Sequence, residues 1–89
     1  MNLNDDERKV LDSLVDALSG DDFGYLSFYA IGVPWGMNRR IVRRACRSLT
    51  RKGLAEFKAG LWTEDGEPAG SGYAATRAGA EFIKQLQAA

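Results

Sequence analysis

The sequence lacks histidine altogether and contains a single cysteine, Cys46. Histidine is the commonest general base and the commonest metal ligand, so its absence removes the usual basis for acid–base catalysis or zinc binding. A lone cysteine excludes an internal disulfide bond and is typical of a reducing cytoplasm. We therefore predict a chain that is not an enzyme and uses no metal or cofactor.

Long hydrophobic runs are also missing. No apolar segment approaches the length of about 20 residues that a membrane span needs. The start, "MNLNDDERKV", has no basic region followed by an apolar block, which argues against a secretory signal. We therefore expect a cytoplasmic location and no membrane partner. The length of 89 residues, with 45% hydrophobic and 27% charged residues, predicts one domain over residues 1–89.

The net charge is zero, but the charges are segregated along the chain. Residues 1–34 carry a net charge of −5, residues 35–58 carry +7, and residues 59–89 carry −2. Seven of the twelve basic residues lie in the segment "GMNRRIVRRACRSLTRKGL", residues 36–54. A basic block between acidic flanks indicates one cationic face on the folded protein.

Apolar residues at three- and four-residue steps predict an amphipathic helix over residues 4–19. Asn4 and Glu7 have the spacing of a capping box at its start. Ser27 is placed to cap a second helix of little more than two turns, which a proline limits. A tight turn through Gly36 should follow this helix.

The clearest element is a third helix that begins after Asn38 and ends before Gly53. At about 100° per residue, five apolar residues fall within an arc of about 140°: Ile41, Val42, Ala45, Cys46 and Leu49. A complementary arc of similar width holds six arginines: Arg39, Arg40, Arg43, Arg44, Arg47 and Arg51. We expect Cys46 to pack as a small hydrophobic residue and not to act as a redox group.

The rest of the chain predicts a β-hairpin and a last helix. "LAEFKAGLWT" alternates in part, "EDGEPAGSG" (residues 64–72) has the composition of a turn, and "YAAT" is the returning strand. Thr76 caps the last helix, in which Gly79 and Ala80 allow close packing. The predicted fold is therefore mainly α with a small β-hairpin, an α+β class, in the order helix, helix, helix, hairpin, helix.

The aromatic residues and the turn acids are weaker candidates for sites. Trp35 and Trp62 are expected in the core and not stacked on bases. Four aromatic residues are expected to anchor the second helix, with a partner surface as the alternative: Phe23, Tyr25, Phe28 and Tyr29. "TEDGEP" lacks the alternating ligand register of a calcium loop, so we interpret it as a plain turn.

The segment "LSFYAIGVPWGMNRRIVRRACRSLTRKGLAEF" resembles a winged helix-turn-helix. In that family an apolar residue of helix two precedes one of the recognition helix by eleven positions, as Ile31 precedes Val42. "WGMN" matches the intervening turn, "SLTRKGL" matches an "L-x-x-x-G-L" exit into the wing, and "GYAATRAG" is similar to the "L-T-x-x-G" junction of many bacterial regulators. The resemblance covers residues 4–87.

The resemblance implies a small transcriptional regulator that binds double-stranded DNA, in a sequence-specific or structure-guided way, through helix 38–52 in the major groove. The groove is about 12 Å wide and admits one helix, and arginine grips guanine edges or phosphates in bidentate fashion. By position, nine residues are DNA-binding candidates: Asn38, Arg39, Arg40, Arg43, Arg44, Arg47, Arg51, Lys52 and Lys58. Regulators of this class usually bind two half-sites, which implies a homodimer.

Other interpretations of the arginines remain open. In one interpretation the arginines form an inert solvated face or pair with the acids of the first helix. In another they bind RNA. In a third they dock an acidic protein, and the chain is a winged-helix interaction module that binds no nucleic acid. The wing favours the last of these, because phosphate repels its acids, which are Glu64, Asp65 and Glu67. These acids are expected to face solvent or a protein partner. The absence of acids among the arginines favours DNA, since soluble helices usually intersperse i,i+4 acids.

Overall fold

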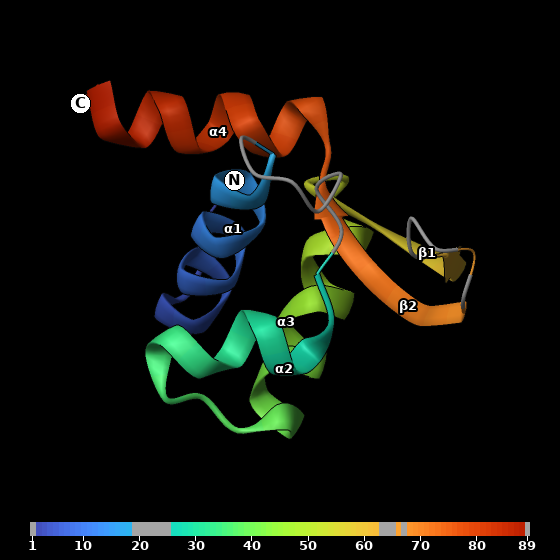
Figure 1. Ribbon diagram of the computed structural model, residues 1–89. Coiled ribbons are helices and arrows are strands. Elements are labelled where there is room, and N and C mark those ends of the chain that lie inside the picture. The colour runs from blue at the N-terminus through green and yellow to red at the C-terminus, as the bar shows by residue number, and fades with distance from the viewer. Residues whose placement is uncertain (1, 19–25, 63–65, 67, 89) are drawn as a thin grey trace.

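The computed structural model describes residues 2–18, 26–62, 66 and 68–88. In this part of the chain, four α-helices and a 3-10 helix accompany a two-stranded antiparallel sheet. The elements are α1 (Asp5–Ala17), α2 (Phe28–Gly32), η1 (Val33–Trp35), α3 (Arg39–Arg51), β1 (Ala55–Trp62), β2 (Pro68–Ala75) and α4 (Arg77–Ala88). Figure 1 shows α4 crossing one end of the molecule and the hairpin projecting to one side. The predicted α+β class and order of elements are confirmed.

The first helix begins as its sequence predicts and ends slightly earlier. The Asn4 side chain accepts a hydrogen bond from the Glu7 backbone N–H at 2.8 Å, and Glu7 Oε1 accepts one from the Asn4 N–H at 3.1 Å. This reciprocal pair is the predicted capping box. The helix stops at Ala17 and leaves Leu18 48% exposed. Leu18 therefore lies outside the face that this helix buries.

A glycine turn joins the second and third helices. The Ser27 hydroxyl accepts a backbone N–H at 3.2 Å, as a cap should, and α2 passes directly into η1. Gly36 then takes a left-handed φ of 65°, a conformation that glycine adopts without a steric penalty. The Asn38 side chain accepts a hydrogen bond from the Ile41 N–H at 3.0 Å and begins α3. The two predicted caps and the predicted turn are confirmed.

The hairpin is longer than the sequence predicts. The pairing runs from Ala55 opposite Ala75 to Trp62 opposite Pro68, with irregular register beyond Lys58. The prediction that residues 64–72 form a turn was wrong for residues 68–72, which belong to β2. Glycine and serine are poor strand formers, but the ladder with β1 outweighs this local preference. Pro68 stands at the first position of the strand, where proline is tolerated.

The core lies where the three N-terminal helices meet α4 and the base of the hairpin. The apolar arc of α3 faces this core, with Val42, Cys46 and Leu49 fully buried. Burial raises the pKa of the Cys46 thiol to about 12, so the thiol is protonated at neutral pH. The predicted packing role of Cys46 is therefore confirmed.

A buried carboxylate joins the start of α1 to the end of α3. Glu7 is 5% exposed and is the buried charged residue of the described part of the chain. Its Oε2 accepts hydrogen bonds from Lys52 Nζ at 2.6 Å and from Ser48 Oγ at 2.7 Å. Burial by itself would raise the pKa of Glu7, but the hydrogen bonds from Lys52, Ser48 and the Asn4 backbone outweigh it and lower the pKa below the ordinary 4.5.

A threonine joins the hairpin to the last helix. Thr76 Oγ1 accepts a hydrogen bond from the Gly79 N–H at 3.1 Å and donates one to the Gly53 carbonyl at 2.6 Å. The Thr76 N–H donates to the Leu54 carbonyl at 3.0 Å. A Cβ on Gly79 would collide with that Leu54 carbonyl oxygen and lie 3.1 Å from Leu11 Cδ1. The predicted cap and the predicted close packing of this helix are confirmed, and they explain the spacing of the "T-x-x-G" junction.

We expect Gly79→Ala to destabilise the protein, although alanine is the better helix former. In an open helix the change gains about 1 kcal/mol. Here the new Cβ meets backbone that cannot rotate away, so α4 must shift, at an expected net loss of about 2 kcal/mol in the free energy of unfolding. Urea denaturation measures this loss. The control Ala78→Gly, at an exposed site on the same helix, should lose about 1 kcal/mol. A Gly79→Ala protein as stable as wild type contradicts the contact.

We expect Glu7→Gln to remove a pH-dependent part of the stability. Because folding lowers the pKa of Glu7, its contribution is present above the ordinary pKa of 4.5 and is lost as the pH falls through the lower folded value. Glu7→Gln should cost about 1–3 kcal/mol at about pH 7 and much less at about pH 3. Urea denaturation at both pH values tests this. Glu81→Gln, in the exposed Arg77–Glu81 pair, is the control and should change stability by less than about 1 kcal/mol. An equal loss for Glu7→Gln at both pH values contradicts the expectation.

Candidate nucleic-acid interface

The exposed face of α3 is formed by arginine. All six predicted arginines of this helix are exposed, as is the capping Asn38: Arg39, Arg40, Arg43, Arg44, Arg47 and Arg51. The salt bridges seen among the described residues join Lys52 to Glu7 and Arg77 to Glu81, so neither involves these arginines. The helix thus presents a continuous cationic surface opposite its buried side.

The first turn of α3 carries cations where a helix is best stabilised by anions. The positive end of the helix dipole favours acids, and α1 has three of them in its first turn. In α3 the first turn has no acid and instead begins with Arg39 and Arg40. The interaction of these two arginines with the helix dipole is therefore unfavourable. Their position suits an anion that approaches from outside.

The arginine face divides into two flanks. Arg44 and Arg51 border a hollow of about 220 Å³ that they share with Asn4 and Asp6 at the start of α1. The other flank borders a hollow of about 500 Å³ beside α2 and the hairpin. We call it the arginine–aromatic crevice, lined by Arg39, Arg43, Arg47, Phe28, Phe57 and Tyr73. The two flanks give the same helix two different chemical surroundings.

The two predicted lysines lie apart from the arginine face. Lys52 Nζ bonds to Glu7 and also donates to the Asn2 carbonyl at 3.2 Å, and its side chain is 30% exposed. Lys58 is exposed on β1, next to Phe57. Because neighbouring residues of a strand point to opposite faces, Lys58 lies on the face of the hairpin away from the crevice. The structure therefore brings together Asn38 and the six arginines, but not the lysines.

Sequence reasoning missed the aromatic side of the crevice. The sequence predicts Phe28 as an anchor of the second helix, with a partner surface as the alternative, and it indicates no site role for Phe57. In the structure Phe57 pairs with Tyr73 across the hairpin, and Phe28 stacks on Tyr73 with ring centroids 5.6 Å apart. No local sequence pattern indicates this pairing, because it depends on the antiparallel register, which sets residues 57 and 73 side by side on one face.

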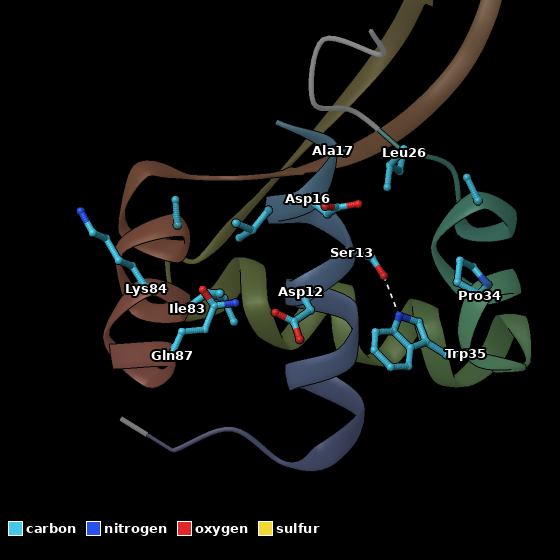
Figure 2. Close-up of a pocket in the computed structure, with 13 residues that line it drawn as sticks. Asp12, Ser13, Asp16, Ala17, Leu26, Pro34, Trp35, Ile83, Lys84 and Gln87 are labelled. Carbon is cyan, nitrogen blue, oxygen red and sulfur yellow. Dashed lines mark hydrogen bonds between the residues drawn. The ribbon is translucent and has the colours of Figure 1, made fainter. Parts of the chain in front are cut away.

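The prediction that Trp35 packs in the core was wrong. Its side chain is 42% exposed, and its Nε1–H donates to Ser13 Oγ at 2.6 Å, as Figure 2 shows. Pro34 and the 3-10 turn carry the indole to the surface, where it lines a groove of about 680 Å³ between α1, α2 and α4. This groove lies among acids of α1, including Asp12, and is separate from the arginine face.

Several predicted residues lie outside the described part of the chain. These are Phe23, Tyr25, Glu64, Asp65 and Glu67, together with the side chains of Tyr29 and Trp62. In the part that is described, no three His, Cys, Asp or Glu residues are grouped so as to hold a metal ion. None of the described helices is long and apolar enough to cross a membrane.

Two solved structures are similar to this chain. One is a candidate DNA-binding protein from Ralstonia eutropha JMP134, with a TM-score of 0.73, 21% sequence identity, and coverage of 96% of this chain and 98% of that one. The other is a MarR family regulator from Neisseria meningitidis, with a TM-score of 0.66, 22% identity and coverage of 96% of this chain. This chain spans 53% of the regulator's length. No family model matches the sequence, and no curated protein matches it.

At these identities the likeness establishes the fold. Four helices and a two-stranded hairpin follow one another in the order that the winged-helix resemblance implies. Both similar proteins carry descriptions that refer to DNA binding or to regulation, and neither is described as an enzyme. The chain therefore has the winged-helix fold.

Proposed function

We propose that this protein binds double-stranded DNA by placing α3 in the major groove, and that it regulates transcription by doing so. One observation carries the proposal: six arginines are exposed on one face of a helix whose opposite face packs into the core through Val42, Ala45, Cys46 and Leu49. A helix fixed in this way can enter a groove about 12 Å wide with its cationic face toward the bases and phosphates. The descriptions of the two similar structures, one as a candidate DNA-binding protein and the other as a regulator, support the proposal.

The position of each residue along the helix suggests whether it contacts base edges or phosphates. Asn38 and the arginines of the first turn and a half lie at the end that enters the groove, where amide and guanidinium groups can bond to base edges. Arg44 and Arg47 follow along the helix. Arg51, at the far end, is suited to phosphate contacts, which set position but carry no sequence information. Lys52 and Lys58 are left out, because one is bonded to Glu7 and the other faces away.

The hairpin contributes little cationic charge to this surface. The described residues of β1 and β2 include a single base, Lys58. The connecting sequence contributes three acids, which phosphate repels. Binding should therefore depend on α3 and not on a wing inserted into the minor groove. The homodimer implied by half-site geometry remains a prediction.

We expect mixed-sequence duplex DNA to bind with strong salt dependence. If about six phosphates are neutralised, the logarithm of affinity should fall with the logarithm of salt concentration at a slope near −5. In Arg43→Glu/Arg47→Glu the slope should become shallower by about 2, and affinity should fall by more than about tenfold. Fluorescence anisotropy at several salt concentrations measures both quantities.

The matched control is Arg77→Glu/Lys84→Glu, which changes the net charge equally on exposed positions of α4. This variant should keep the wild-type slope. An equal loss in both variants would show general charge attraction and contradict a role for α3. Absence of duplex binding at low salt would exclude the DNA function and favour the alternative, in which the arginine face docks an acidic protein.

A further inference from the structure

The arginine–aromatic crevice has features that duplex binding does not use. The crevice is a hollow of about 500 Å³ between α3 and the base of the hairpin, which adjoin in Figure 1. Arginine can make contacts with phosphates or with base edges in a groove, and these contacts do not require an exposed aromatic ring. Phe57 nonetheless stands 52% exposed beside three arginines. A lone exposed apolar residue needs no explanation, but its position in this crevice does.

The three aromatic rings of the crevice form a continuous series. Phe28 stacks on Tyr73 at 5.6 Å with an interplanar angle of 28°, and Tyr73 lies 5.1 Å from Phe57 at 57°. The central ring, Tyr73, is buried at 8% exposure, whereas the ring of Phe57 at one end of the series is accessible to a ligand. The Arg39 guanidinium lies 5.7 Å from the Phe28 ring centroid, a cation–π contact at the other end. An incoming planar ring can therefore extend the series at Phe57.

The crevice selects a ligand that combines a planar ring with negative charge. The ring would stack on Phe57, and the charge would lie on Arg43 and Arg47, which border the same hollow. An unpaired nucleotide has both parts, with phosphates on each side of its base. Alternating aromatic and cationic groups are also the general means by which proteins hold single strands. Acidic side chains of a peptide would satisfy the arginines but would leave the exposed part of the Phe57 ring uncovered.

We propose that the arginine–aromatic crevice binds an unpaired nucleotide, so that the protein binds single-stranded DNA with a base stacked on Phe57 and the flanking phosphates on Arg43 and Arg47. The inference rests on the proposed function insofar as both use the arginines of α3. Single-strand binding differs from duplex binding in its use of Phe57, because bases stacked inside a duplex cannot stack on this ring. Substitutions at Phe57 therefore separate the two.

The test compares two probes with the full chain by fluorescence anisotropy. One is a labelled oligothymidylate of about 15 nucleotides, and the other is a blunt duplex. Phe57→Ala should weaken binding of the oligothymidylate by about 5- to 100-fold, the loss typical of one stacked base, and should leave duplex affinity within about twofold. Phe57→Tyr keeps a ring and should retain single-strand binding. Phe57→Leu keeps an apolar side chain without a ring and should behave like Phe57→Ala.

A fluorescent base supplies a readout that does not depend on affinity. With 2-aminopurine in the oligothymidylate, wild type at saturation should change the emission of the base, and Phe57→Leu at saturation should not. Circular dichroism confirms that each variant is folded before it is compared. An oligothymidylate affinity that is the same in wild type and Phe57→Ala overturns the inference. Duplex binding without single-strand binding also overturns it and leaves the proposed function intact, whereas binding to neither probe overturns both.

Discussion

Repulsion among the arginines of α3 is the constraint on which the rest of the structure depends. Arg39, Arg43 and Arg47 follow one another at i,i+4 spacing, and each such like-charge pair opposes the helix by about 0.2–0.5 kcal/mol. The helix dipole adds to this cost at the first turn, which has no acid. The opposite face outweighs these terms, because each fully buried large apolar side chain, such as Val42 or Leu49, contributes about 1.5–3 kcal/mol.

Each end of this self-repelling helix is fixed by a specific contact. Asn38 caps the start, and Glu7 holds the last turn through Ser48 and through Lys52 just beyond it. Both contacts leave the arginines themselves exposed. A bound polyanion would relieve the repulsion that the folded protein tolerates, so binding and stability should be coupled through α3. This coupling gives a physical reason for a costly surface on a small domain.

Local pattern was enough to predict α3, and it was not enough to predict the crevice. The apolar arc and the cationic arc lie on the same helix, so their residues could be assigned from spacing alone. The caps at Asn4, Asn38 and Thr76 were predictable for the same reason. The first half of β2 was missed because its strand conformation depends on pairing with β1 and not on its own composition. Trp35 was misplaced because a hydrogen bond to another helix decides its position.

To predict the crevice, one would have to know the register of the hairpin, the position of α2 and the orientation of α3 together. The reason is that Phe57, Phe28 and Arg43 come from three different elements.

If the crevice holds a single strand as proposed, Arg43 and Arg47 are engaged with the phosphates of that strand. The same two arginines are then not available to a duplex groove. The two modes must compete for one protein molecule, because they share cations but differ in the ring that a base must reach. A paired base is already stacked on its neighbours, so the state of the DNA would decide which mode α3 adopts.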